Sequence, residues 1–298
     1  MQMDIHSNSS REDIPLHTKK KGFNMKKSLL TLTVALLAST AAFAADVTHP
    51  FYQPEKGGLS SETNLMYQNF DHGKKYDNTV TQGALVTETL TYGVTRKFAV
   101  TGTVADVWDF QGRMKKYDTW ANPAWSLGVK YNLIDCEKTN LKVQLGANYM
   151  QGALSLNPLL NSGMFFKHKQ KEFSAFAKVG YQATGSFIPY IEGSIIKQVG
   201  KYEQDPIWTA RAGGYLTLTD LVSVDAGLDY IWDSATHVRD GQGDIGGNGH
   251  IKVFGMDGSV NYKLTEAVSL GLTGSYVFDM KPAEKDYYTV GLNLKAAF

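Results

Sequence analysis

The sequence contains a single cysteine, Cys136, so no disulfide can form within the chain. Only 8 of its 298 residues are proline. Its 30 basic and 29 acidic residues leave a formal net charge of +1, which gives no electrostatic reason to expect a nucleic-acid partner. Beyond a short run near the amino terminus, no stretch approaches the ~18 consecutive apolar residues of a membrane-spanning helix. These absences argue against a disulfide framework, a nucleic-acid-binding domain and a helical membrane protein.

The short apolar run has the layout of a secretory signal peptide. Met25-Lys26-Lys27 supplies a basic start, Leu29 to Ala38 an apolar middle, and Ala42-Phe43-Ala44 a small-x-small cleavage pattern. We therefore expect export, with cleavage after Ala44. The polar stretch before Met25 favours an over-extended gene start, with a functional arm as the alternative. The predicted organisation is an over-extended start at 1–24, a signal peptide at 25–44, a periplasmic lead-in at 45–57 and the folded body at 58–298.

Alternating polar and apolar residues recur along the whole of this body. A period of two predicts strands with one apolar and one polar face. About twelve such segments occur, an even number that brings both ends of the body to the same side. The predicted strands are 58–70, 82–94, 97–110, 121–133, 139–151, 171–183, 187–199, 206–218, 221–233, 250–264, 267–279 and 286–298.

The connections between these strands alternate in length. Tight turns are predicted at Thr95-Arg96, Ile134 to Lys138, Thr184 to Ser186, Thr219-Asp220 and Thr265-Glu266, whereas the other links are mostly longer. Aromatic residues gather at both ends of the strands, as in the interfacial girdles of a membrane barrel. A soluble β-sandwich also alternates, but it has edges to protect and does not need aromatic residues at both strand ends. The pattern favours an all-β fold, a transmembrane antiparallel up-and-down β-barrel of about twelve strands.

The chain ends on the strand YYTVGLNLKAAF, whose apolar face continues to the last residue. This ending resembles the carboxy-terminal assembly signal of Gram-negative outer-membrane β-barrel proteins. The hairpin from Glu88 to Phe98 and the approach from Pro50 to Gly57 resemble those of small, porin-like barrels of that class. The resemblance implies location in the cell outer membrane, and as partners outer-membrane lipid and the barrel assembly machinery. It also implies an assembly signal formed by Tyr288, Val290, Leu292, Leu294 and Phe298.

No residue pattern indicates catalysis. Four of the five histidines after the signal peptide fall in or beside long loops, where we interpret them as exposed loop residues: His72, His168, His237 and His250. Asp240, Gln242 and Asp244 have the first spacings of a calcium loop, but Ile245 stands where glycine is required and no closing glutamate follows. We therefore predict no enzyme activity, no metal site and no cofactor.

Two acidic residues break the alternation. Glu88 shares the parity of Leu90 and Tyr92, and Asp106 shares that of Val104, so regular strands would place both carboxylates against lipid. We expect a β-bulge that turns them inward, with a contact site for a partner or a lipid headgroup as the alternative.

The inward positions are small and polar and include charges of both signs. The register across the tight turns predicts a ladder of Lys178, Glu192, Arg211 and Asp229 at mid-height. We expect a narrow porin-like channel for passive diffusion of small hydrophilic solutes; the alternative is a non-conducting structural or adhesion barrel of the cell envelope. The sequence does not indicate an oligomeric state. The predicted pore-lining residues are Lys142, Lys178, Glu192, Arg211, Asp225, Asp229, Asp257, Lys263 and Lys295.

Overall fold

The computed structural model describes residues 46–70, 82–109, 124–136, 139–152, 170–199, 206–233, 239–240, 243–244, 252–281 and 287–298. The predicted start at 1–24, the signal peptide at 25–44 and the loop histidines lie outside these residues. No helix in the described part of the chain is long and apolar enough to cross a membrane.

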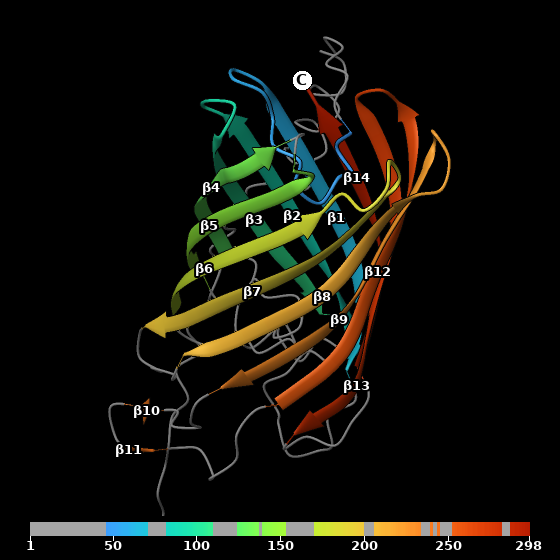
Figure 1. The fold of residues 1–298 in the computed structure, drawn as a ribbon. Helices are drawn as coiled ribbons and strands as arrows, with labels where there is room; N and C mark the ends of the chain where they lie inside the picture. Colours follow the sequence, from blue (N-terminus) through green and yellow to red (C-terminus); the bar gives the residue numbers. More distant parts are fainter. Residues whose placement is uncertain are drawn as a thin grey trace, which may run out of the picture. The chain divides into compact units, whose positions relative to one another are not determined.

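Twelve strands close into one antiparallel barrel in which each strand pairs with its neighbours in the chain (Figure 1). The predicted fold class is confirmed. A separate two-stranded sheet, β10 (Arg239–Asp240) and β11 (Gly243–Asp244), lies in the loop considered for calcium, most of which is outside the described residues. The barrel strands are β1 (Leu59–Phe70), β2 (Gln82–Gly93), β3 (Phe98–Asp109), β4 (Ala124–Cys136), β5 (Leu141–Gly152), β6 (Gln170–Tyr181), β7 (Phe187–Val199), β8 (Ile207–Thr217), β9 (Val222–Asp233), β12 (Lys252–Thr265), β13 (Val268–Lys281) and β14 (Tyr287–Ala297).

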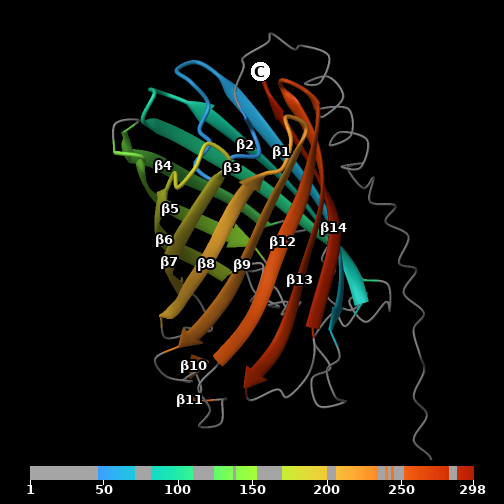
Figure 2. The same ribbon diagram turned by 45° about the vertical axis from the view of Figure 1, so that its right-hand side comes forward.

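The strands lie side by side and are tilted, as β8, β9, β12 and β13 show in Figure 2. Four of the tight turns begin with a threonine whose hydroxyl accepts backbone N–H groups from the turn. Thr95 accepts from Lys97 and Phe98, and Thr219 from Leu221 and Val222. Thr184 and Thr265 each accept from the residue two positions on. A short side chain that satisfies turn amides is why threonine recurs at this end of the barrel.

The fifth turn differs from the prediction. The alternation predicts a turn from Ile134 to Lys138, but β4 continues to Cys136. Between Asn132 and Ile134 the register with β5 shifts by one residue, so Leu133 forms a bulge. The reversal then involves Asn140, which adopts a positive φ of 55°, a conformation that asparagine tolerates better than most residues.

The barrel closes between the first and last strands. Ser60 pairs with Ala297, and the register continues without a break to Phe70 and Tyr287. Beyond β14, the N–H of Phe298 donates to the carbonyl of Leu59 at 2.7 Å, and the N–H of Leu59 donates back at 3.1 Å. The final aromatic residue therefore completes the seam and leaves no free edge there, which is the condition for a sheet surrounded by lipid.

The outer face of the barrel is apolar and exposed. Ile191 is 63% exposed, Leu127 58% and Leu272 56%, fractions that no water-soluble core residue has. Aromatic residues lie on this face towards both ends, with Tyr92, Tyr181 and Tyr262 near the short turns. Near the other end Trp125, Tyr149 and Phe173 form a contact ladder across three strands, with ring centroids 5.7 and 5.0 Å apart. An exposed apolar belt with aromatic girdles fits lipid and excludes the soluble sandwich.

The predicted bulge at Glu88 and Asp106 is absent, and this expectation was wrong. Both strands keep a regular register, with Glu88 opposite Thr63 and Val104, and Asp106 opposite Val86. Glu88 therefore stays on the outer face, yet it is only 5% exposed. Its carboxylate accepts a hydrogen bond from Ser61 at 2.6 Å and another from Thr63. Two hydroxyl donors thus reduce the cost of placing this carboxylate on the outer face without moving the backbone.

Candidate functional site: the barrel lumen

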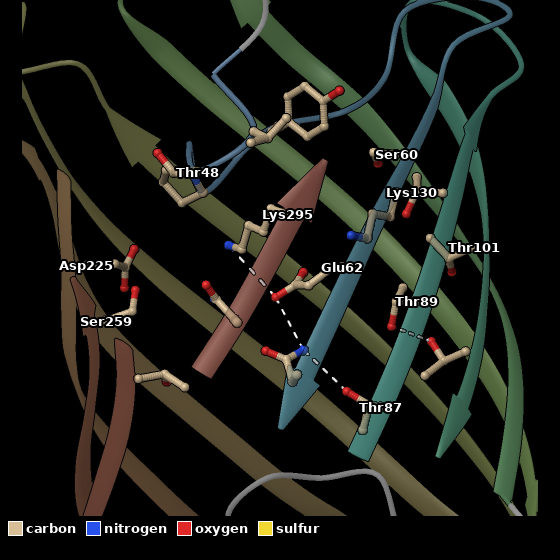
Figure 3. A pocket seen from close by; sticks show the side chains of 18 of the residues that line it. Thr48, Ser60, Glu62, Thr87, Thr89, Thr101, Lys130, Asp225, Ser259 and Lys295 are labelled. Atoms are coloured by element: carbon tan, nitrogen blue, oxygen red, sulfur yellow. Dashed lines mark hydrogen bonds and ion pairs between the residues drawn. The ribbon is translucent and has the colours of Figure 1, made fainter. Parts of the chain in front are cut away.

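The lumen contains a cavity of about 650 Å³ (Figure 3). Part of its wall carries threonine hydroxyls from β2 and β3, and Thr89 hydrogen-bonds to Thr103 at 2.9 Å across these strands. Other parts carry charged side chains from β4, β6, β8, β9, β12 and β14. A cavity lined in this way can exchange hydrogen bonds with a hydrated solute.

Arg211 is the centre of a charge cluster in the described part of the lumen wall. Its guanidinium makes a bidentate pair with Asp257, at 2.8 and 3.1 Å, and a second ion pair with Asp225 at 2.7 Å. Asp229 is farther away, at 3.8 Å, and one of its oxygens is buried without a hydrogen-bond partner. Three carboxylates therefore surround one cation, so this part of the wall carries a net negative charge.

The geometry of Arg211 depends on its neighbours. A β-carbon on Gly227 would lie 2.7 Å from Arg211 Nε, so the guanidinium needs glycine there. The Tyr190 ring lies 5.1 Å from the guanidinium carbon, and the Tyr190 hydroxyl donates to both oxygens of Asp225 at 2.7 and 2.9 Å. These contacts hold the cluster in one arrangement.

The predicted charge ladder is confirmed as a register. Lys178 lies opposite Glu192, Glu192 opposite Arg211, and Arg211 opposite Asp229. The ion pairs follow it only in part, because Lys178 pairs with Glu192 at 2.7 Å while Arg211 favours Asp225 and Asp257 over Asp229. The longer guanidinium reaches diagonally across the lumen face, which a rule based on directly opposite residues cannot anticipate.

Two further lysines project into the cavity (Figure 3). Lys295 lies 3.8 Å from Glu62, a loose ion pair. Lys130, from β4, forms no ion pair within 4 Å with any carboxylate of the described residues. Lys130 is not among the predicted pore-lining residues, although it lines the cavity. Its side chain lines the cavity without a neighbouring carboxylate from the described strands.

The predicted pore-lining residues divide into two groups. Lys178, Arg211, Asp225, Asp257 and Lys295 line the cavity. The others contact those groups or lie towards the strand ends, outside the cavity wall: Lys142, Glu192, Asp229 and Lys263.

An unforeseen occupant fills the short-turn end of the lumen. Residues 46–54, which precede β1, fold against the inner wall. Thr48 Oγ1 lies 2.8 Å from the Tyr215 hydroxyl and 3.0 Å from Ser223 Oγ, and the Tyr215 hydroxyl donates to Asp46 at 2.7 Å. Lys178 Nζ reaches the carbonyl of Pro50 at 3.5 Å. We call residues 46–54 the inner segment. The sequence predicts only a lead-in here, because nothing in its pattern indicates burial.

The location in the lumen shifts the pKa values of Asp46 and Tyr52. Burial alone would raise the pKa of Asp46, but hydrogen bonds from Thr48 and Tyr215 outweigh it and hold the pKa below its usual range. Because the pKa of Asp46 is depressed when the segment is docked, the ionised carboxylate stabilises docking. This stabilisation is complete at neutral pH and is lost as the pH falls through the lowered pKa. Burial, reinforced by the Glu55 carboxylate, raises the pKa of Tyr52 to about 12.

The chain leaves the lumen through a tight crossing. Gly57 donates to the carbonyl of Gly93 at 2.7 Å, and Gly93 donates to Gly58 at 2.9 Å. Gly57 has a positive φ of 83°, and a β-carbon on Gly93 would collide with the backbone at Glu55. Glycine at these positions therefore allows the chain to pass from the lumen into β1.

The carboxy-terminal residues assigned to the assembly signal lie along β14 and its end. Tyr288, Val290 and Leu292 are between 39 and 50% exposed on the outer face. Leu294 and Phe298 are partly covered near the seam. No group of three or more metal-ligating side chains occurs in the part of the chain that the structure describes.

Comparison with known proteins identifies the fold. No protein-family model and no curated sequence matches the chain. Among solved structures, the COG4313 outer membrane channel from Pseudomonas putida F1 is similar over 84% of this chain and 98% of its own, with a TM-score of 0.54 and 13% identity. The NanC porin is similar over 79% of this chain and 98% of its own, with a TM-score of 0.52 and 7% identity.

These similarities agree with the closed sheet and its apolar belt. The chain has the fold of a Gram-negative outer-membrane β-barrel with a porin-like architecture. At such low identity the likeness extends to the fold and to no solute.

Proposed function

We propose that the mature chain is an outer-membrane channel for passive diffusion of small hydrophilic solutes, narrowed at one end by its inner segment. The observation that carries this proposal is the 650 Å³ lumen cavity with hydroxyl and charged walls. The inner segment would enter from the periplasmic side, because short turns of such barrels face the periplasm. The charged residues of the lumen would make the pore weakly selective among ions. The proposed function includes no catalytic activity.

A non-conducting barrel of the envelope is the second candidate. The inner segment favours this candidate, because it occupies part of the lumen and is held there by hydrogen bonds to Tyr215 and Ser223. In that case the ion pairs would serve only to neutralise charge inside the barrel.

Liposome swelling separates the two candidates. Liposomes that contain the mature chain should swell in a pentose and more slowly in a disaccharide, because the cavity admits small polar molecules more easily. Protein-free liposomes provide the baseline. Swelling at that baseline for both sugars, with a correctly folded barrel, would favour the structural alternative.

Assembly of the barrel gives an independent prediction. Deleting Phe298 should lower the amount of heat-modifiable barrel in outer membranes severalfold, because it removes the two hydrogen bonds with Leu59 and the end of the proposed assembly signal. Lys295→Ala is the matched control, since Lys295 faces the lumen and loses only a loose pair with Glu62. Equal amounts of assembled barrel from the two variants would contradict recognition by the assembly machinery at this end.

A further inference from the structure

The ring of Phe51 fills a shaped slot in the barrel wall. Phe51 is 7% exposed and packs with Ile188, Tyr190 and Tyr215, each 4% exposed or less. The Phe51 and Tyr190 rings meet edge to face at 83°, with centroids 6.3 Å apart. A β-carbon on Gly180 would lie 2.6 Å from the Phe51 ring, so the wall has a glycine where the ring enters. We call these four wall residues the ring slot.

A cation stands beside the ring slot. Lys178 Nζ lies 5.9 Å from the centre of the Phe51 ring and 5.4 Å from that of Tyr190. The same ammonium approaches the carbonyl oxygen of Pro50, the residue that precedes Phe51, at 3.5 Å. The inner segment therefore presents an aromatic ring together with an oxygen acceptor a few bonds away. The wall offers an apolar slot and the Lys178 ammonium, which also pairs with Glu192 at 2.7 Å.

The occupant of the slot does not belong to the barrel strands. The inner segment is held at one side by Asp46 and Thr48 and at the other by the glycine crossing before β1. The slot itself is formed by β6, β7 and β8, whose pairing does not include the segment. A solute that carries the same two groups can compete for the slot, and its binding shifts the population towards the undocked segment.

We propose that the ring slot binds aromatic carboxylates whose ring and acid are separated by a short alkyl chain, and that they displace Phe51. The ring takes the place of the Phe51 side chain, and the carboxylate takes the place of the Pro50 carbonyl at Lys178. Displacement of Phe51 would release the inner segment and widen the lumen. This consequence for conduction rests on the proposed channel function, whereas the binding site does not depend on it.

The test uses 3-phenylpropionate as the probe and calorimetry on the folded, detergent-solubilised mature chain. Phe51→Ala should bind the probe at least about tenfold more tightly than the wild type, because the internal competitor is gone. Gly180→Ala should bind none measurably, because the added methyl group occupies the slot. Gly193→Ala is the control, since a β-carbon there meets nothing closer than 3.8 Å, and it should bind as the wild type does. Heat-modifiable migration on gels establishes that each variant is folded.

Two comparisons test the two recognised groups. The ring is tested with propionate, which lacks it and should not bind to Phe51→Ala. The carboxylate is tested with Lys178→Gln in the Phe51→Ala background, which should lose the preference for 3-phenylpropionate over 3-phenylpropanol. Equal binding of the probe by the Phe51→Ala and Gly180→Ala variants would overturn the proposal, as would equal binding of propionate and the probe.

Currents recorded in parallel separate this proposal from the channel function. The probe should increase the current through the wild-type barrel and leave that through Gly180→Ala unchanged. Binding as described, with no current from any variant, would contradict the channel and leave the ring slot intact. Current without probe binding to Phe51→Ala would contradict the ring slot alone.

Discussion

Phe51→Ala is expected to raise the single-channel conductance of the mature chain severalfold. Burial of a phenylalanine side chain contributes about 3 kcal/mol, and removal of that contribution shifts a two-state docking equilibrium by roughly a hundredfold towards the undocked state. The hydrogen bonds of Asp46 and Thr48 would remain, so the segment should sample the lumen without blocking it steadily. The measurement is the current through single barrels in a planar bilayer.

The matched control for this prediction is Glu55→Ala. Glu55 belongs to the same stretch of chain, but its side chain is exposed and outside the ring slot. The conductance of the Glu55→Ala barrel should equal that of the wild type. A Phe51→Ala barrel with wild-type conductance would show that the docked ring does not limit the current.

Arg211→Met is expected to destabilise the barrel and to make it more cation-selective. The change leaves Asp225, Asp229 and Asp257 without their guanidinium. Loss of one partner from a fully buried ion pair costs roughly 3–5 kcal/mol, and the cost is smaller here because the cluster lines the cavity and Asp257 is 38% exposed. The same loss adds net negative charge to the lumen. Unfolding in urea measures the first effect, and the reversal potential in a salt gradient measures the second.

Arg211→Lys and Lys97→Ala serve as comparisons. Arg211→Lys keeps the charge but cannot make the bidentate pair with Asp257, so it should preserve most of the selectivity and lose part of the stability. Lys97→Ala removes an exposed cation in a tight turn and should change neither measurement. Unchanged selectivity in a folded, conducting Arg211→Met barrel would show that this cluster only neutralises charge.

The strands could be predicted from the sequence because one face of each must meet lipid. A one-residue slip would move every side chain to the wrong face, so alternation predicts the strands and excludes odd slips, while the tight turns determine the register that remains. The pairing of Lys178 with Glu192 follows from the tight turn between β6 and β7. Thr95, Thr184, Thr219 and Thr265 mark the turns because their hydroxyls satisfy turn amides.

Other features could not be predicted because they depend on contacts between residues far apart in the chain. Glu88 breaks the alternation, but only the structure shows that Ser61 and Thr63, on the neighbouring strand, offer the donors that keep it on the outer face. The inner segment has no period at all, and its location depends on Tyr190, Tyr215 and Ser223, more than a hundred residues away. Sequence patterns indicate local structure and the faces of regular strands. A segment without regular structure that folds into a lumen leaves no such pattern.

The most direct test of a self-narrowed channel compares two currents in the same planar bilayer. One comes from the mature chain and the other from a chain that lacks residues 46–54 but keeps the crossing at Gly57 and Gly58. Both barrels should conduct, and the shortened barrel should carry the larger current and pass larger sugars in swelling assays. Two folded barrels that carry equal currents, or no current at all, would contradict a channel that its own inner segment narrows.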